Sequence, residues 1–366
     1  MDRAEGTRAA TTRNLLAALI AAFTYAQVYG KYTGSITVRL RGSDEGSTDG
    51  TGARRESRPH RAMTQGSGQQ PLVSVVVPVY NRPDLVCAAI DSVLGQTYDR
   101  VELIVVDDGS TDETVDVIQS EYPTVRLIEH DEQHGGSAAR NSGIEEASGK
   151  YVAFLDSDDT WAPSKLERQV NRLESESTDI VAAYCDYHTD KSNPLVQAVS
   201  DMVRRPRGQE GGAELIPLVM TRRLDLGGAS TLIANSELVR AIGGFDESFP
   251  RHQDLEFVIR LLERGELVFV DEPLVRRGET PDPGLDEIEI ASELFLDTFS
   301  EHVESSASMG YDAYGVQQYF LAVEHLRRGS FRTGLTRLVR ATVPTRRDWL
   351  SLGHAVIGGA RRALRG

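Results

Sequence analysis

The sequence predicts an α/β protein with a mainly parallel, Rossmann-like central sheet flanked by helices, followed by a helical C-terminal region. Between residues 72 and 185, short apolar segments alternate with segments of helical spacing, the order typical of doubly wound sheets. Residues 72–79 are rich in valine without polar alternation, as in strands buried on both faces of a parallel sheet. From about residue 285, only helical spacing follows.

Turn and cap residues divide the chain into the elements of this alternation. The predicted strands cover residues 72–79, 101–106, 125–128, 151–155, 180–185, 230–234 and 266–270. The predicted helices cover residues 83–95, 110–119, 135–147, 163–173, 235–241 and 255–264, and then 285–302, 315–328, 331–341 and 349–365. Asn81 and Asn235 are expected to be helix N-caps, and Ser110 with Glu113 reads as a capping box.

Three parts are expected along the 366 residues. Residues 1–70 form an N-terminal extension, mostly disordered because residues 42–70 contain hardly an apolar side chain. The apolar residues 15–28 are interrupted by polar ones and fall short of the roughly 20 residues that span a bilayer. Residues 71–284 form the α/β domain, and residues 285–366 form the helical region.

The charge balance excludes one class of partner. The formal net charge is −15 at pH 7 and the pI is about 5.1, which argues against nucleic acid as a ligand. The two cysteines, Cys87 and Cys185, lie in apolar segments, so the pattern favours a reducing compartment without a disulfide framework. We therefore expect a cytoplasmic protein that does not bind nucleic acid.

Acidic residues follow two of the predicted strands. Asp107 and Asp108 follow residues 101–106, and the run Asp156-Ser157-Asp158-Asp159 follows residues 151–155. The carboxyl ends of parallel strands meet at one edge of a sheet, where ligands bind, so these clusters should be neighbours. A turn after residue 155 would let one carboxylate hold a hard divalent cation while another accepts a hydrogen bond from a ligand hydroxyl.

Two alternatives bear on this edge of the sheet. Either acid cluster could simply cap the helix that follows it, although the recurrence at two strand ends favours a ligand site. A dinucleotide-binding dehydrogenase would share the architecture, but the turn at residues 78–83 lacks the G-x-G-x-x-G phosphate cradle. Phosphates would therefore be held by a metal ion and arginine.

Four motifs resemble those of a known family. They read Val-Ser-Val-Val-Val-Pro-Val-Tyr-Asn at residues 73–81, Glu-Leu-Ile-Val-Val-Asp-Asp-Gly-Ser-Thr-Asp at 102–112, Ser-Ala-Ala-Arg-Asn-Ser-Gly at 137–143 and Phe-Leu-Asp-Ser-Asp-Asp at 154–159. In this order and spacing the chain resembles the family 2 glycosyltransferases, including those of archaeal and bacterial surface-glycan assembly.

The resemblance implies a GT-A fold and an inverting transfer from a nucleotide-diphosphate sugar, with Mg²⁺ or Mn²⁺ between protein and diphosphate. We expect the donor to be a UDP-sugar. The donor-binding positions that it implies are Pro78, Tyr80, Asn81, Asp107, Asp108, Arg140 and Asp156, and the implied metal ligand is Asp158. Pro78 and Tyr80 would lie against the nucleobase, and Asp108 would accept from the base or ribose. Arg140 would approach the donor sugar or diphosphate.

Structural roles remain open for several of these residues. Tyr80 could cover the end of the sheet, and Asp107 with Asp108 could only cap a turn. Arg140 could be a solvated helix residue or part of a salt bridge. For Asp156 and Asp158 the alternative is the helix cap already named.

A further acidic residue lies near the predicted helix at residues 255–264. In similar enzymes a Glu-Asp pair precedes this helix, and the Asp that matches Asp254 is the catalytic general base. An inverting displacement needs a carboxylate opposite the leaving group, so that the acceptor hydroxyl loses its proton as it attacks. Gln253 stands where the family has the preceding acid, which removes a charge beside the base. N-capping is the alternative for Asp254, and a turn role is the alternative for His252.

The C-terminal end is basic although the whole chain is acidic. From residue 324 onward only Glu324 and Asp348 are acidic, against ten arginines. Amphipathic basic helices suit an anionic membrane surface, so we expect peripheral contact with the inner face of the cell membrane. The alternative is a helical hairpin packed on the catalytic domain with its arginines in solvent.

These features predict a cytoplasmic glycosyltransferase that adds one sugar to a lipid-linked glycan on a polyprenyl or dolichyl phosphate. Surface-protein N-glycosylation or cell-surface polysaccharide assembly would be its pathway. The alternatives are a catalytically silent nucleotide-sugar-binding scaffold and a transferase for a soluble or protein acceptor. A processive polysaccharide synthase is disfavoured because we find neither long apolar spans nor a Gln-x-x-Arg-Trp motif.

Overall fold

The computed structural model describes residues 70–174, 179–189, 208–278, 284–345 and 348–365. The prediction of a disordered N-terminal extension falls on residues that lie outside this part, apart from Gln70. By its backbone contacts the chain divides into the units Met1–Gly66 and Ser67–Gly366. The description below concerns the second unit.

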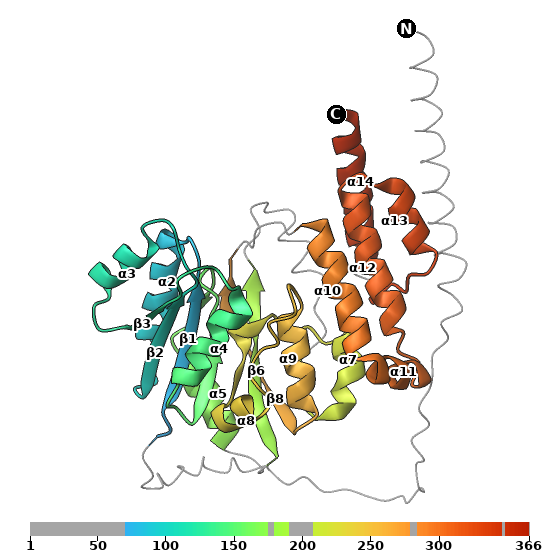
Figure 1. Cartoon of the computed structure of the whole chain (residues 1–366). Coiled ribbons are helices and arrows are strands. Elements are labelled where there is room, and N and C mark those ends of the chain that lie inside the picture. Colours follow the sequence, from blue (N-terminus) through green and yellow to red (C-terminus); the bar gives the residue numbers. More distant parts are fainter. Residues whose placement is uncertain (1–69, 175–178, 190–207, 279–283, 346–347, 366) are drawn as a thin grey trace, which may run out of the picture. The chain divides into compact units, whose positions relative to one another are not determined.

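Among the described residues, eight strands form one sheet with the order β3-β2-β1-β4-β7-β6-β8-β5 (Figure 1). The strands are β1 (Val73–Val79), β2 (Val101–Asp107), β3 (Arg126–Glu129), β4 (Tyr151–Phe154), β5 (Thr160–Trp161), β6 (Ile180–Thr189), β7 (Ile233–Asn235) and β8 (Glu266–Arg277). Strands β3, β2, β1 and β4 run parallel, as do β6 and β8. Strands β7 and β5 are antiparallel to their neighbours. The predicted mainly parallel sheet is confirmed.

Helices cover both faces of this sheet. They are α2 (Pro83–Leu94), α3 (Thr114–Glu121), α4 (Gly136–Glu146), α5 (Lys165–Glu174), α7 (Ile216–Met220), α8 (Ser236–Ala241) and α9 (Gln253–Leu262). Val76 of β1 packs in the core with residues of α4, α7, α8 and α9. Its neighbours Val75 and Val77 pack on the other face with residues of α2, α3 and α5. The valine run is therefore buried on both faces, as its composition predicts.

Two strands differ from their predicted extents. Strand β8 continues past Val270, the predicted end, to Arg277. A β-bulge makes this possible, because the register with β6 passes from Val270 directly to Pro273. The predicted strand at 230–234 is instead a 3₁₀ turn, Ala229–Thr231, followed by β7.

Of the predicted caps, one is confirmed and two are wrong. Asn235 Oδ1 accepts from Leu238 N at 3.0 Å and caps α8. Helices α2 and α3 have no side-chain cap. Asn81 Oδ1 instead accepts from Thr111 N at 2.8 Å, and Asn81 N donates to Ser110 Oγ at 2.9 Å. These polar residues therefore tie together the turns after β1 and β2.

The C-terminal region is helical, as predicted, with α10 (Leu285–Thr298), α11 (Ser300–Ser308), α12 (Ala313–Arg327), α13 (Phe331–Leu338) and α14 (Asp348–Arg365) (Figure 1). The helix expected at residues 285–302 ends early, and α11 follows Phe299. Phe295 and Phe299 belong to the same buried cluster as the residues of α9. In the part of the chain described, no helix has the length and apolar character needed to cross a bilayer.

Lys165 is a buried cation in the core beneath α5. Its side chain has 0% exposure, its Nζ lies 3.7 Å from the Trp161 ring centroid, and Nζ has no hydrogen-bond partner among the described residues. Burial lowers the pKa of Lys165 to about 8, although Cys185 acts in the opposite direction. An unfolded lysine has a pKa of about 10.4, so the unfolded chain binds more protons between about pH 8 and 10. Stability should therefore rise with pH through this window.

We expect Lys165→Met to raise the free energy of unfolding at pH 7 by about 1–2 kcal/mol, because methionine fills a similar space without a buried charge. Urea unfolding near pH 7 and near pH 9.5 measures the effect, and the gain should shrink at the higher pH. Lys150→Met is the control, because Lys150 is half exposed and pairs with Glu174. A variant less stable than the wild type at both pH values would contradict this account of Lys165.

Candidate active site

The carboxyl ends of β1, β2 and β4 meet at one edge of the sheet. In the parallel register, Val79 of β1 pairs with Asp107 of β2, and Val76 pairs with Phe154 of β4. Asp156 follows two residues beyond Phe154. The two acid clusters are therefore brought to the same edge, as the strand order predicts.

Asp107 and Asp108 differ in what their carboxylates do. Asp108 is 3% exposed and holds the loop before α4, because it accepts from His134 N at 3.0 Å and from Gly135 N at 2.7 Å. Asp107 Oδ2 accepts from Ser110 N at 2.8 Å. Its buried Oδ1 has no hydrogen-bond partner among the described residues. An acceptor atom thus remains available on Asp107, whereas Asp108 supports the loop.

Pro78, Tyr80 and Asn81 lie at the end of β1. Pro78 is buried inside the strand, paired with Val106, whereas Tyr80 follows the strand and is partly exposed. Asn81 has a left-handed backbone with φ of 50° and bonds to the loop after β2. A partly open aromatic ring at a sheet edge can pack against a flat ligand ring. The geometry is compatible with the nucleobase role expected for Tyr80.

The carboxylates expected to contact the donor and the metal ion point to different arginines. Arg140 of α4 forms an ion pair with Asp156, and its guanidinium lies 5.3 Å from the Phe245 ring centroid. Asp158 Oδ2 lies 3.0 Å from Arg82 Nη1. The side chain of Asp158 is 8% exposed and that of Asp156 is 31% exposed. The salt bridge considered as an alternative for Arg140 is therefore present, and it places Arg140 at the strand-end acids.

Asp159 shows how closely the carboxylates are crowded. The chain turns after β4, with Asp159 N donating to Asp156 O at 2.9 Å. Asp159 Oδ1 accepts from Gly278 N at 2.9 Å. Burial, followed by the charge of Asp156, raises the pKa of Asp159 to about 6, and Asp158 adds to this effect. A cation bound at this turn would relieve the repulsion.

The donor atoms at this turn suit a hard divalent ion. Carboxylate oxygens are typical ligands of Mg²⁺ and Mn²⁺, and Mg²⁺ is commonly held by one or two carboxylates together with substrate phosphates. Within the described residues, no group of three His, Cys, Asp or Glu side chains is arranged to hold a metal ion. The residues therefore fit an ion held by Asp158, with Asp156 nearby and the remaining ligands supplied by substrate and water.

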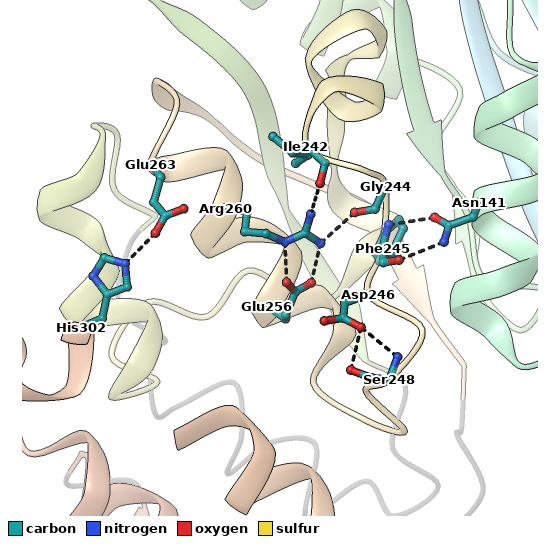
Figure 2. Close-up of polar contacts among 10 residues, drawn as sticks. All are labelled: Asn141, Ile242, Gly244, Phe245, Asp246, Ser248, Glu256, Arg260, Glu263 and His302. Carbon is teal, nitrogen blue, oxygen red and sulfur yellow. Dashed lines mark hydrogen bonds and ion pairs between the residues drawn. The ribbon is translucent and has the colours of Figure 1, made fainter. Parts of the chain in front are cut away.

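Helix α9, which carries Asp254, is fixed by a buried ion pair (Figure 2). Arg260 pairs with Glu256 one turn earlier, and Glu256 is 2% exposed. Arg260 also donates to Ile242 O and to Gly244 O, both at 2.7 Å. These carbonyls belong to the turn after α8, so the turn and the helix are held together.

The turn after α8 is also bonded to α4, and the carboxyl end of α9 is bonded to α11 (Figure 2). Asn141 Nδ2 donates to Phe245 O at 2.9 Å, and Phe245 N donates to Asn141 Oδ1 at 2.8 Å. At the other end, His302 Nε2 lies 2.7 Å from Glu263 Oε1. Since Asn141 follows Arg140 on α4, one helix connects the strand-end acids with the position of α9. No local sequence signal indicated these contacts.

Asp254 lies in the first turn of α9 and not ahead of it. The helix begins at Gln253, and His252 occupies the N-cap position, so the N-cap alternative for Asp254 is wrong. Asp254 Oδ1 accepts from Leu255 N at 3.0 Å. Its Oδ2 faces Gly228, where an added Cβ would lie 3.8 Å from Asp254 Oδ2 and 3.8 Å from Arg277 Nη2.

Arg277 lies between the two acidic groups. Burial alone would lower the pKa of Arg277, but its surroundings, with Asp159 first and also Asp156 and Asp254, raise it. The Arg277 guanidinium is therefore close enough to the carboxylates after β4 and to Asp254 on α9 to feel the charge of both. The sequence predicts a strand that ends at residue 270, so Arg277 was not expected to lie on the sheet. The Arg276-Arg277 pair at the observed end of β8 was the only feature of the sequence that pointed to a role for Arg277.

Proteins of one family resemble this chain. A sequence profile described as "Glycosyl transferase family 2" matches residues 74–220. An uncharacterized glycosyltransferase of Rickettsia prowazekii (strain Madrid E) is 33% identical over 231 residues, which are 62% of this chain and 70% of that protein. The Escherichia coli UDP-Glc:alpha-D-GlcNAc-diphosphoundecaprenol beta-1,3-glucosyltransferase WfaP is 37% identical over 121 residues. These are 33% of this chain and 47% of WfaP, so the match spans about half of that relative.

A solved structure shares the fold. The mannosyltransferase PcManGT from Pyrobaculum calidifontis, in complex with GDP-Man and Mn²⁺, has a TM-score of 0.53 and 16% identity, covering 81% of this chain and 88% of that chain. The likeness extends over the mainly parallel sheet with its flanking helices, which is the GT-A architecture. With the family profile and the Rickettsia relative, these findings show that the chain belongs to glycosyl transferase family 2 and is a glycosyltransferase.

Proposed function

We propose that this glycosyltransferase moves one sugar from a UDP-sugar to a lipid-linked glycan in a single inverting displacement. The observation that carries the proposal is the position of Arg277, which lies beside Gly228 together with Asp254 and is also influenced by the charges of the acids after β4. A donor diphosphate bound at the β4 end would therefore lie beside the carboxylate that can activate an acceptor. This is the arrangement that a displacement at the anomeric carbon requires.

Asp254 is the proposed general base. As the acceptor oxygen bonds to the anomeric carbon, its proton passes to Asp254 Oδ2, the oxygen that faces Gly228. The bond from the anomeric carbon to the diphosphate breaks in the same step, and its electron pair leaves with the diphosphate. Because attack and departure occur on opposite faces, the configuration at the anomeric carbon is inverted. A base placed at the attacking hydroxyl contributes typically 10²- to 10⁴-fold.

The leaving diphosphate gains negative charge, which the donor side must stabilise. A divalent ion held by Asp158 would supply part of that stabilisation. Arg277 offers a guanidinium whose positive charge is favoured by the neighbouring carboxylates. Arg140, held against Asp156, would orient the donor sugar. The nucleoside would bind at the ends of β1 and β2, where it would contact Asp107 Oδ1, Tyr80, Asn81 and Pro78. Asp108 would support the loop before α4.

The proposed acceptor is a glycan on a polyprenyl or dolichyl phosphate. The support is the relative WfaP, whose name gives a UDP-Glc donor and a diphosphoundecaprenol acceptor. Such acceptors serve surface-protein N-glycosylation and cell-surface polysaccharide assembly, which are the pathways that we propose.

A peripheral contact with the inner face of the membrane is part of the proposal. The exposed side chains of α13 and α14 support it, since Leu335 is 40% and Trp349 44% exposed. Arg332 on α13 and Arg361 on α14 are exposed beside them. Near an anionic lipid surface each arginine contributes about 1 kcal/mol. Apolar and basic residues together are what an interfacial helix requires.

Transfer by the purified full chain tests the proposal. The chain, with Mn²⁺ or Mg²⁺, is incubated with each of several UDP-sugars and with a GlcNAc-diphosphate-lipid acceptor, free GlcNAc or a peptide. We expect mass spectrometry to find the lipid acceptor heavier by one sugar and the other two unchanged. Transfer only to a soluble acceptor would show that the lipid-linked acceptor is wrong. Binding of UDP-sugars without transfer to any acceptor would favour the catalytically silent scaffold.

A further inference from the structure

Two residues with unusual backbones touch each other beside Asp254. Within the described ranges, positive φ values outside glycine occur at Asn81, Arg222 and His252, and the last two have φ of 51° and 67°. A left-handed backbone costs a residue with a side chain about 1 kcal/mol or more. Such strain persists where the surroundings hold it, and it is concentrated at functional sites. The pair Arg222 and His252 is therefore a candidate for a functional role.

Arg222 packs against two rings, and the carboxylates of Asp254, Asp225 and Asp348 influence its pKa without forming an ion pair with it among the described residues. Its guanidinium lies 4.4 Å from the Phe320 ring centroid on α12. Its Nη2 lies 3.3 Å from His252 Nδ1 and 3.2 Å from His252 Nε2. Nearly equal distances to both ring nitrogens show that Nη2 is not directed at the lone pair of one nitrogen. The Arg222 Nε is buried without a hydrogen-bond partner among the described residues.

A second arginine and the start of α9 add to this positive charge. Arg251 precedes His252, is partly exposed, and takes part in none of the ion pairs found among the described residues. Burial and the two arginines lower the pKa of His252 well below its usual range, so its ring is neutral. The amino end of a helix is itself partly positive, and α9 begins at Gln253. Among the residues that the structure describes, neither guanidinium of this cluster forms an ion pair with a carboxylate.

The arginine cluster and Arg277 are both close to Asp254. Arg277 is influenced by the acids after β4 as well as by Asp254, so it belongs to the donor side. Burial lowers the pKa of Arg222, and Asp254 is the first of the carboxylates that oppose this. The arginine cluster differs from Arg277 in its acidic neighbours, because Asp156 and Asp159 influence Arg277 but are not among the carboxylates that influence Arg222. An anion bound there would accompany the acceptor and not the donor.

We propose that Arg222 and Arg251 bind a phosphate of the acceptor. This proposal rests on the proposed function. The acceptor would be a lipid diphosphate that carries a short glycan. Its attacked hydroxyl would then reach Asp254 while its phosphate reaches the two arginines. The planar guanidinium donates paired hydrogen bonds that match phosphate oxygens. Bound phosphate would supply Arg222 Nε with the partner that it lacks. Arg222 and Arg251 are then acceptor-binding residues that select charged acceptors.

Equilibrium binding of farnesyl diphosphate to the full chain tests this subsite without requiring transfer. The measurement is made in EDTA, so that no metal ion can hold the probe at the β4 end. Arg251→Gln and Arg222→Gln are each expected to weaken binding by about 10- to 100-fold, the effect of losing charge-assisted hydrogen bonds. Farnesol, which has the same chain without phosphate, should bind all variants alike. Arg223→Gln is the matched control, because Arg223 is exposed and lies over the Tyr311 ring.

Arg251→Gln gives the decisive comparison for the phosphate subsite, because Arg251 is partly exposed. Arg222 is packed between rings, so Arg222→Gln could disturb the fold. Selective loss of farnesyl diphosphate binding in Arg251→Gln, with the control unchanged, supports the subsite. Equal binding by wild type and Arg251→Gln, or no diphosphate binding by the wild type, overturns it. Failure of the proposed function would appear differently, as intact diphosphate binding without sugar transfer to lipid acceptors.

Discussion

Asp254→Asn is expected to lower kcat for sugar transfer by about 10²- to 10⁴-fold, with little change in the affinity for the donor. The amide cannot take the proton from the acceptor hydroxyl. Its oxygen can still accept from Leu255 N, as Asp254 Oδ1 does at 3.0 Å, so α9 should begin as before. Transfer is measured under steady-state conditions with the donor and the acceptor varied separately.

The control for this change is Asp271→Asn, an exposed position on β8. It removes the same charge and should leave kcat unaltered. Melting temperatures close to that of the wild type would show that both variants are folded. An Asp254→Asn enzyme with normal kcat would exclude Asp254 as the base.

Asp158→Asn is expected to lower transfer by about 10²- to 10³-fold, because the leaving diphosphate loses the cation that stabilises its charge. The concentration of Mn²⁺ needed for half-maximal activity should rise as well. In the structure Asp158 Oδ2 lies 3.0 Å from Arg82 Nη1. A variant of Asp158 therefore loses an ion pair in addition to a metal ligand, and these two effects must be separated.

Arg82→Gln separates them. It breaks the ion pair and keeps the Asp158 carboxylate, so its Mn²⁺ requirement should stay close to that of the wild type. Equal losses in Arg82→Gln and Asp158→Asn, with the same metal dependence, would show that Asp158 acts only through the ion pair. In that case the metal role proposed for Asp158 would be abandoned.

The strands of the donor side could be predicted from the sequence because their signals are local. The valine run of β1 and the acids after β2 and β4 each mark a strand and its end within a few residues. Parallel pairing then fixes that these ends meet at one edge. The same reasoning failed at Asn81 and Ser110, where polar side chains bond across two loops and do not cap the next helix. A capping pattern cannot distinguish the two outcomes.

The other half of the site depends on contacts between distant segments. Arg277 reaches the acids only because a bulge lets β8 continue past Pro273. Arg222 meets His252 thirty residues further on and Phe320 almost a hundred residues further on. No periodicity or spacing encodes such meetings. The position of Asp254 could be inferred by resemblance, but its neighbours could not.

The anomeric configuration of the product tests the inverting transfer most directly. The full chain is given an α-linked UDP-sugar and the GlcNAc-diphosphate-lipid acceptor, and the purified product is examined by proton NMR at its new anomeric position. Displacement assisted by Asp254, on the face opposite the diphosphate, predicts a β-linked sugar. An α-linked product would contradict the account, because it requires retention of configuration and a different role for Asp254.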